Sequence, residues 1–279
     1  HIHNVRGYTF DTERKLVTFT NMVVQDGKVI NIGGDALGHA FPNAEQLDGK
    51  GQTLLPGLID AHGHLLGLGA TLLEVDLREA TSALNAAQRV AAYQQNNPNL
   101  SWVRGRGWNQ VLWPEKQFPT ASILDEAIAD VPVWLERVDG HAGWANSAAL
   151  KIAGIDNTTV SPEGGKILTD EAGNPTGVLI DTAMYLVEQH IPKLTHEVKQ
   201  NQMDAAGSHL LSLGITSMHD AGIDKATYDF YRELAMQRRL PLRVYAMLSA
   251  TAPELPEMLE TGIIRSDDDM LLMRSVKAY

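Results

Sequence analysis

Two histidines stand on alternate positions directly after an apolar run. Residues 54–69 read LLPGLIDAHGHLLGLG, and the pair is His62 and His64. Because side chains two positions apart on a β-strand point to the same face, such a strand would project both imidazoles together. Neutral imidazoles side by side suit a borderline divalent metal such as zinc. The alternative is a pair of surface histidines on a loop, but the apolar run and the PGLID sequence favour a metal site.

Three further polar side chains follow predicted strands. His141 lies in RVDGHAGWANS after strand 131–138, and His219 and Asp220 end strand 214–219. At the end of a predicted strand, His141 could orient a substrate or stabilise a developing oxyanion; a hydrogen bond to a backbone carbonyl is the alternative. His219 and Asp220 either line the pocket or support metal ligands from behind. Local capping of the following turn is the alternative for Asp220.

Lys277 ends the apolar run LLMRSVK at residues 271–277. A charged ammonium group is costly to bury at the end of such a strand, so this position calls for a partner or a chemical modification. A lysine that snorkels to solvent or forms a salt bridge is the alternative.

An aromatic-rich segment, RGRGWNQVLWPEKQFPT, lies in the long connection at residues 85–130. Connections of this length tend to be functional or to form inserted subdomains. Trp108, Asn109 and Trp113 could line a lid that excludes water from the site and shapes its specificity. The alternative, equally weighted, is that the aromatic side chains only anchor a long loop to the domain beneath it.

The elements that must position these residues fall into two parts. Residues 1–56 are rich in β-formers and carry the turn pair Asp26-Gly27, which predicts a hairpin in a small β domain. Residues 57–279 alternate short apolar runs with helical patterns, as in a parallel α/β architecture. The predicted strands are 54–61, 131–138, 214–219, 241–248 and 271–277, and the predicted helices include 195–213 and 224–239.

Composition narrows the classes of partner and compartment. The 279 residues carry a net charge of −11, which argues against a nucleic acid or an anionic membrane as a partner. The absence of cysteine excludes disulfides and thiolate ligands and suits the cytoplasm. No apolar run is long enough to span a bilayer. Because residue 1 is a histidine, the sequence leaves open whether a leader peptide has been removed.

The motif PGLIDAHGH resembles the first-strand motif of the amidohydrolase superfamily of metal-dependent hydrolases. Further segments resemble its YtcJ-like branch, amidohydrolase family 3, and occur in the same order over nearly the whole chain: RGWNQVLWPEKQFPT, RVDGHAGWANSAAL, GNPTGVLID, GITSMHDAG, LRVYAMLS and RSVKAY. The resemblance implies a TIM-type (β/α)8 barrel beside a small β-sandwich-like domain, begun by residues 1–56 and completed by C-terminal strands. Its active site would lie at the carboxyl face of the barrel, and strand 131–138, as the second barrel strand, would place His141 at that face.

The same resemblance implies a centre of one or two divalent metal ions, most simply zinc. Its ligands here would be His62, His64 and Lys277, the last carboxylated by CO2 so that it bridges two metals. The family's remaining histidines and its last-strand aspartate would follow the lysine strand. Only five strand candidates precede that point, where a barrel needs eight, so we expect the chain to be the N-terminal portion of a longer protein.

The resemblance therefore implies an enzyme that hydrolyses a C–N bond, other than a peptide bond, in a small amide, N-acyl amine or cyclic amide. Metal-activated hydroxide would be the nucleophile, with His141, His219 and Asp220 as the catalytic candidates. The alternative is a catalytically silent regulatory or ligand-binding protein on the same scaffold. We expect a small-molecule partner and allow for a homo-oligomer.

Overall fold

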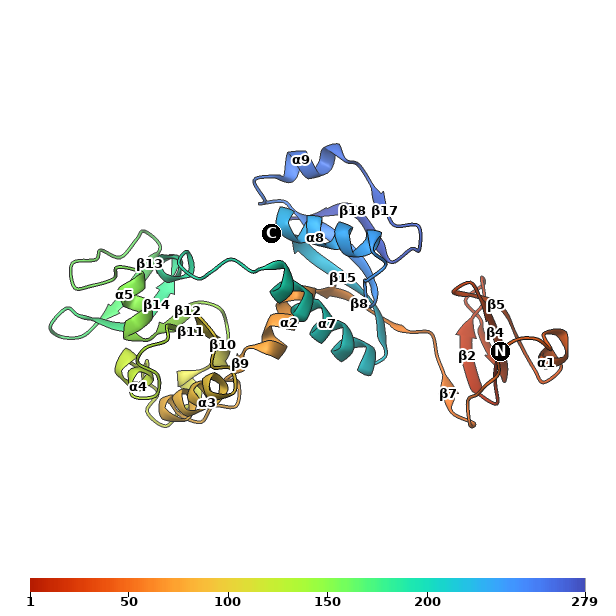
Figure 1. The fold of residues 1–279 in the computed structure, drawn as a ribbon, viewed down its shortest axis with the longest axis horizontal. Helices are drawn as coiled ribbons and strands as arrows, with labels where there is room; N and C mark the ends of the chain where they lie inside the picture. The colour runs from red at the N-terminus through yellow and green to blue at the C-terminus, as the bar shows by residue number, and fades with distance from the viewer. Residues whose placement is uncertain (279) are drawn as a thin grey trace. The chain divides into compact units, whose positions relative to one another are not determined.

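The chain divides into two compact units in a computed structural model that describes residues 1–278 (Figure 1). The smaller unit comprises residues 1–60 and 213–217, and the larger comprises residues 61–212 with the chain from 218 onward. The division passes through β8 (Leu58–Gly63) and β15 (Ile215–Ile223), which are neighbours in one sheet. Each unit is described by itself.

The smaller unit is built from short strands in two sheets, ordered β5-β4-β1-β6 and β3-β2-β7. The hairpin predicted at Asp26-Gly27 is confirmed, because both residues have positive φ and Gln25 pairs with Lys28 across the turn. The elements are β1 (Ile2–His3), β2 (Arg6–Phe10), β3 (Leu16–Phe19), β4 (Asn21–Gln25), β5 (Lys28–Gly33), α1 (Leu37–Ala40), β6 (Leu47–Asp48) and β7 (Thr53–Leu54).

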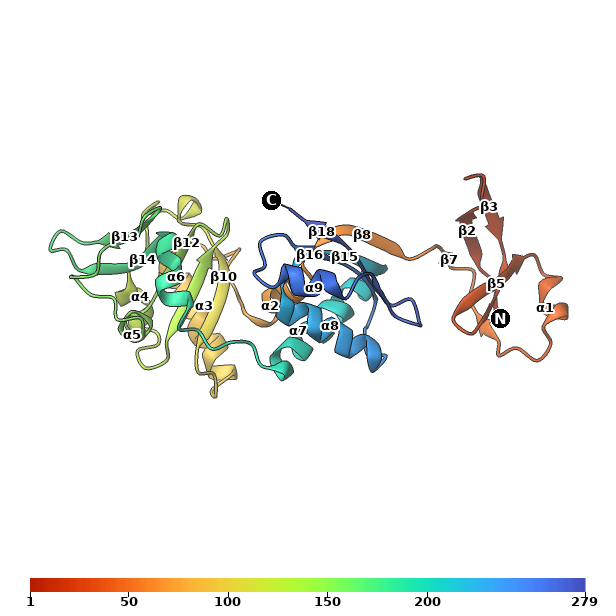
Figure 2. The ribbon, with the colours of Figure 1, turned by 90° about the horizontal axis from the view of Figure 1, so that it is seen from above.

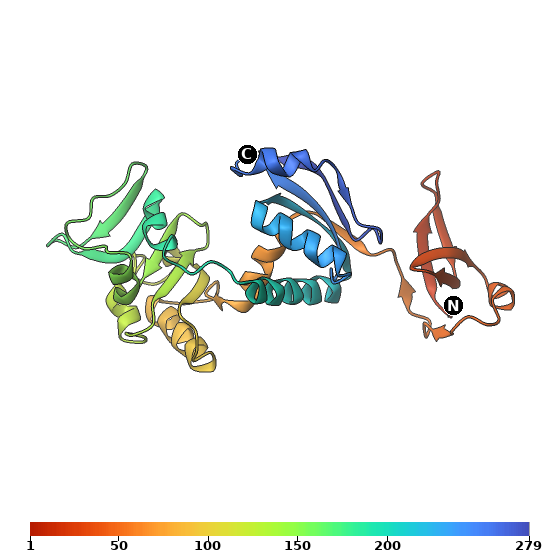
Figure 3. The same cartoon turned by 45° about the horizontal axis from the view of Figure 1, so that its top comes forward.

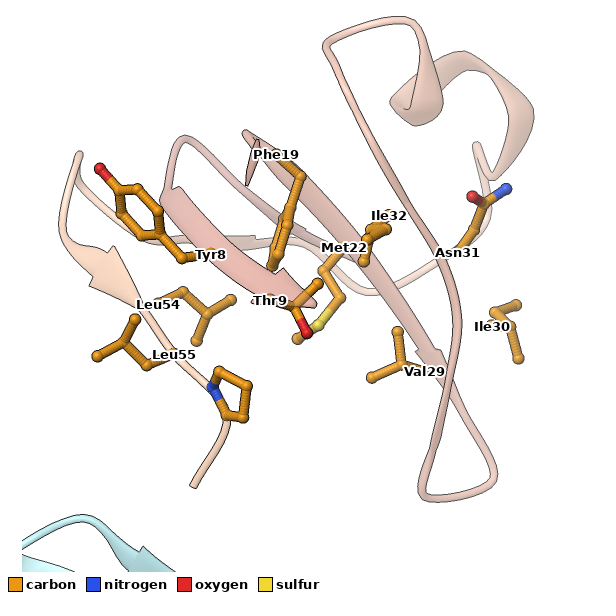
Figure 4. Close-up of a pocket in the computed structure, with 11 residues that line it drawn as sticks. Tyr8, Thr9, Phe19, Met22, Val29, Ile30, Asn31, Ile32, Leu54 and Leu55 are labelled. Carbon is orange, nitrogen blue, oxygen red and sulfur yellow. The ribbon is translucent and has the colours of Figure 1, made fainter. Parts of the chain in front are cut away.

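An apolar hollow of about 620 Å³ opens on this unit (Figure 4). Phe19 forms part of its wall and is buried because its ring lies against Gly7, where any Cβ atom would clash with it. Val29 and Leu55 line the hollow and stay exposed. The side chains of the two sheets therefore leave an open apolar hollow on the surface of the small domain.

In the larger unit, four of the five predicted barrel strands lie in one five-stranded sheet, ordered β17-β18-β16-β15-β8. Besides β8 and β15 it contains β16 (Arg243–Ser249), β17 (Ile264–Arg265) and β18 (Leu271–Lys277), and β16 pairs with β18 in parallel. Its helices are α2 (Leu65–Leu73), α7 (His196–Ser212), α8 (Lys225–Met236) and α9 (Leu255–Glu260), and Figure 2 shows α7, α8 and α9 on one side of the sheet. Strand, helix and parallel strand follow one another as in a TIM-barrel-related α/β fold.

Two of these helices match the predicted ranges closely. The helix predicted at 195–213 is α7, where Thr195 accepts a hydrogen bond from the Val198 amide and Gly214 follows with φ 78°. The helix predicted at 224–239 is α8, capped by Asp224 through the Thr227 amide. Helix α2 packs closely along α7 (Figure 3), and Gly69 permits this because a Cβ there would lie 2.0 Å from the Gln202 carbonyl oxygen.

The predicted strand 131–138 forms, as β11 (Val133–Arg137), but in a different sheet. This six-stranded sheet is ordered β13-β14-β12-β11-β10-β9, so the expectation that 131–138 is the second barrel strand is wrong. The other strands are β9 (Val75–Asp76), β10 (Val103–Trp108), β12 (Ala142–Ala145), β13 (Gly165–Thr169) and β14 (Pro175–Asp181). Strand β11 pairs in parallel with β10 and antiparallel with β12, and neither partner is a predicted barrel strand. These strands belong to residues 75–188, which lie between β8 and β15 in the chain and are called the insertion below.

Helices cover both faces of the six-stranded sheet. One face packs Trp108 and Trp144 against α3 (Ala83–Asn96) and α4 (Ala121–Asp125), and the other packs Trp134 and Leu179 against α5 (Ser147–Ile152) and α6 (Tyr185–Glu188). The remaining short elements here are the 3-10 helices η1 (Gln110–Leu112) and η2 (Thr182–Met184). The insertion is thus an α/β layer structure with its own core on each face.

Candidate functional site

Strand β8 brings the two histidines of the HGH motif together. His62 lies within the strand and His64 directly follows it, at the N-cap position of α2. Their ring centroids are 5.9 Å apart and the ring planes are perpendicular. Zinc binds an imidazole nitrogen at about 2.0–2.1 Å, so two rings that share one ion have centroids roughly 5–6 Å apart. The centroid distance is therefore compatible with a shared metal ion, and the side chain of His64 is 61% exposed, so an ion could approach it.

A buried carboxylate lies behind His64. Oδ1 of Asp220, on the neighbouring strand β15, is 4.0 Å from Nδ1 of His64, and the Asp220 side chain is only 5% exposed. Burial raises the pKa of Asp220, while hydrogen bonds from the Tyr231 hydroxyl and the Leu65 amide, and the nearby His64, act in the opposite direction. The predicted supporting position of Asp220 is thus one that the geometry permits.

His219 lies on the opposite face of β15 from Asp220, because consecutive residues of a strand point to opposite sides. Its ring centroid is 4.8 Å from that of Tyr245 on β16, and the Tyr245 hydroxyl donates to Oγ of Ser275 on β18 at 2.9 Å. The hydrogen bonds with Ser275 and then Arg274 lower the pKa of Tyr245. A polar row across three adjacent strands thus occupies this face, so His219 and Asp220 have separate surroundings.

Lys277 ends β18 as predicted and is half-buried. It pairs in register with Ser249, and its carbonyl oxygen accepts from the Ala250 amide at 2.8 Å. Within residues 1–278, no group of three or more His, Cys, Asp or Glu side chains is arranged to hold a metal ion. This set of residue types does not include lysine, whose carboxylated form would contribute an oxygen ligand. The role of Lys277 as the third ligand therefore stays a prediction.

His141 lies in the loop that joins β11 to β12, two neighbouring central strands of the six-stranded sheet. The reason given for it from the sequence, the rim of a barrel strand, is therefore wrong, since β11 is not a barrel strand. Its 69% exposed side chain lies with Nδ1 2.8 Å from Oδ1 of Asp181, a carboxylate and not the backbone carbonyl of the alternative. The Asp181 amide in turn donates to the His141 carbonyl oxygen at 3.1 Å.

Asp181 was not among the candidates from the sequence, although it ends the quoted segment GNPTGVLID. Its φ of 50° and ψ of −125° are unfavourable for a residue with a side chain. Non-glycine residues in such conformations concentrate at functional sites, where the surrounding structure holds them. The pair of His141 and Asp181 is therefore a second candidate for chemistry, based on geometry and not on the barrel argument.

The three candidates for substrate contact lie mostly within the insertion's core. Trp108 and Trp113 are buried, and their Nε1 groups donate to the carbonyl oxygens of Leu135 and Ala80 at 2.8 Å. Asn109 is half-buried and caps η1 by accepting from the Val111 amide. This placement agrees with the hypothesis that the aromatic side chains anchor a long loop to the domain beneath it. Two buried and hydrogen-bonded indoles stabilise the insertion beneath its loops.

Comparison with known proteins bears on the whole arrangement. The sequence profile described as "Amidohydrolase family" matches residues 45–279. A crystal structure of a metal-dependent hydrolase from Pyrococcus horikoshii matches with a TM-score of 0.76 at 26% sequence identity, over 99% of this chain and 53% of that chain. These matches confirm the resemblance predicted from the motifs and support an α/β, TIM-barrel-related fold.

Three curated relatives are similar over most of this chain. Protein LONG AFTER FAR-RED 3 of Arabidopsis thaliana is 34% identical over 77% of this chain and 37% of its own length. The amidohydrolase YtcJ of Bacillus subtilis is 30% identical over 85% and 46%, and the N-substituted formamide deformylase of Arthrobacter pascens is 31% identical over 79% and 42%. The chain thus spans less than half the length of these relatives.

Proposed function

This chain belongs to the amidohydrolase family, and from that premise we propose that it carries metal ligands of a hydrolase that cleaves a C–N bond other than a peptide bond. The observation that supports this proposal most directly is the imidazole pair of His62 and His64, whose centroids are 5.9 Å apart. The similarity to an N-substituted formamide deformylase supports the choice of bond.

The ligand roles follow from the chemistry of each donor. His62 and His64 hold one divalent ion, most simply zinc, through neutral imidazole nitrogens. Lys277, carboxylated by CO2, contributes an anionic oxygen and allows a second ion. When bound, such an ion lowers the pKa of a coordinated water molecule and polarises a substrate carbonyl.

Other side chains act on the substrate and on protons. The exposed ring of His141 is oriented by Asp181, so that Nδ1 faces the carboxylate and Nε2 faces solvent, where it exchanges a proton with a substrate or its leaving nitrogen. His219, beside Tyr245, contacts substrate on the face of β15 that is opposite to Asp220.

The substrates are small amides, N-acyl amines or cyclic amides, with N-substituted formamides as the first to assay. We propose the cytoplasm as the compartment because the chain contains no cysteine. Among the described residues, no helix has both the length and the apolarity needed to cross a membrane.

Metal content tests the ligand assignment. Elemental analysis of the purified full-length protein would compare the natural sequence with the double variant His62→Ala/His64→Ala, and we expect zinc to be lost from the variant. The matched control is His209→Ala, which removes an exposed histidine from α7. Unchanged metal content in the double variant would overturn the assignment.

Turnover separates the enzyme from the silent binding protein. We expect the zinc-loaded protein to release amine from an N-substituted formamide or another N-acyl amine, and the double variant to lose that activity. A zinc-loaded protein that binds such amides without hydrolysing any of them would contradict the enzymatic proposal and favour a ligand-binding function.

A further inference from the structure

A buried tyrosine is connected to the metal-binding face through Asp220. Tyr231 lies on α8 without solvent exposure, and its hydroxyl donates to Oδ2 of Asp220 at 2.5 Å. The other carboxylate oxygen, Oδ1, is the atom that lies 4.0 Å from Nδ1 of His64. The three side chains thus form a row from the helix core to the exposed imidazole.

Each member of this row has a fixed orientation except the last. Asp220 is held by the Tyr231 hydroxyl and by the backbone amide of Leu65, the first residue of α2. Hydrogen bonds of this kind offset the desolvation of a buried carboxylate. The ring of His64 is exposed, and its Nδ1 would need to approach Oδ1 by about 1 Å to form a hydrogen bond.

The two nitrogens of a metal-binding imidazole have different requirements. The coordinating nitrogen must present a lone pair, so the other nitrogen of the neutral ring carries the hydrogen and donates it to an acceptor. A carboxylate in that position fixes the tautomer and the ring orientation and makes the ligand more basic. Asp220 Oδ1, 4.0 Å from Nδ1 of His64, is the carboxylate oxygen that would take this position once the ring moves closer.

We propose that Asp220 and Tyr231 are positioning residues for His64, with Asp220 accepting the Nδ1 hydrogen so that Nε2 faces the metal. Tyr231 holds the carboxylate in place from the helix side and reaches the metal only through it. The inference rests on the proposed function, because it assumes that His64 is a ligand. The competing explanation is that Asp220 and Tyr231 only join β15 to α8 and leave His64 unaffected.

Zinc affinity of the full-length apoprotein separates these explanations. We expect Asp220→Asn to raise the zinc dissociation constant by about 10- to 100-fold, the range found when a partner of a metal-binding histidine is replaced. Tyr231→Phe should raise it in the same direction by a smaller factor, because Asp220 remains but loses one of its two supports. The titration would be followed by calorimetry with zinc alone.

The chain offers a matched control on the same helix. Tyr228 is also buried on α8, but its hydroxyl has no hydrogen-bond partner among residues 1–278, so Tyr228→Phe removes the same atom without affecting Asp220. We expect this variant to bind zinc as tightly as the natural sequence. If Tyr231→Phe and Asp220→Asn also bind zinc with unchanged affinity while remaining folded by circular dichroism, the positioning role is refuted.

The imidazole nitrogens of His64 give a readout that a purely structural role would not move. In the zinc-loaded protein, 15N spectra should show Nε2 coordinated and Nδ1 protonated, and Asp220→Asn should change the Nδ1 signal. Coordination through Nδ1 would overturn the inference. Failure of the proposed function is distinguishable, because then the natural sequence itself would bind no zinc that depends on His62 and His64.

Discussion

The two larger sheets are built from similar apolar strands but leave opposite kinds of surface. In the five-stranded sheet, Leu58 and Ile59 of β8 are 58% and 62% exposed, and the polar side chains of the candidate metal centre lie at strand ends. In the six-stranded sheet both faces are packed, and all five tryptophans of the chain are buried there: Trp102, Trp108, Trp113, Trp134 and Trp144. We infer that the second sheet is chiefly a stabilising structure, with His141 and Asp181 at its strand ends, and that the first presents the candidate metal ligands.

The largest effect that would test this difference is a cavity in the six-stranded sheet. Trp144→Ala should lower the free energy of unfolding by about 3–5 kcal/mol, because the indole is fully buried, packs against Trp108 and Trp113, and donates to the Thr120 carbonyl oxygen. Urea denaturation measures the loss. The control Leu112→Ala, at an exposed position, should change stability by less than about 0.5 kcal/mol.

The zinc content of the Trp144→Ala variant shows whether the six-stranded sheet and the candidate metal centre are structurally independent. The folded fraction of the Trp144→Ala variant should contain as much zinc as the natural sequence. Loss of zinc from molecules that remain folded would show that the tryptophan core also maintains the metal centre. The two sheets would then not be independent.

A smaller loss of stability is expected from a substitution in α2, the helix that directly follows the HGH motif. Gly69→Ala should destabilise the protein by about 1–3 kcal/mol, because the new Cβ would lie 2.0 Å from the Gln202 carbonyl oxygen and push α2 away from α7. We also expect zinc affinity to weaken, since His64 stands at the start of α2. Chemical denaturation and zinc titration measure the two effects.

The same helix contains its own control. Gly67 is exposed, with only ordinary contacts around an added Cβ, so Gly67→Ala should be neutral or stabilise by up to about 1 kcal/mol through helix propensity. If the two variants behave alike, close packing of α2 on α7 is not what positions the start of the helix.

Local sequence patterns predicted the bounds of helices and strands better than they predicted which strands pair with one another. The ranges of α7 and α8 followed from periodicity and capping residues such as Thr195 and Asp224, which act within one turn of helix. The sheet that β11 joins depends on hydrogen bonds with β10 and β12, and its letters VPVWLERV resemble those of a barrel strand equally well. An apolar run indicates a buried strand without naming its neighbours.

The same limit applies to the candidate site. His62 and His64 could be paired from the sequence because a strand places alternate residues on one face. Asp181 and Tyr231 could not, because their partners His141 and Asp220 lie 40 and 11 residues away. Alone, Tyr231 is one more aromatic residue on the apolar face of a helix, and only the folded structure shows its hydroxyl on a buried carboxylate.

The smallest effect concerns the loop that carries His141. Asp139 accepts two hydrogen bonds from Arg137, at 2.8 and 2.7 Å, and one from the His141 amide, and these contacts, the Arg137 pair foremost, hold the pKa of Asp139 below its ordinary value of 3.8. The unfolded chain therefore takes up the proton more readily, so the stability from this pair is fully present above about pH 4 and is lost as the pH falls through the lower folded-state pKa.

Asp139→Asn should accordingly lower the free energy of unfolding by less than about 1 kcal/mol at pH 7, because the pair is partly exposed and screened by solvent. The difference from the natural sequence should shrink as the pH is lowered below about 4, since both proteins then carry a neutral side chain there. Urea denaturation at several pH values measures it, with Asp267→Asn, in the exposed loop before β18, as the control. A difference that grows in acid would mean that Asp139 stabilises its loop as a protonated donor and not as a carboxylate, and the orientation of His141 would then need another source.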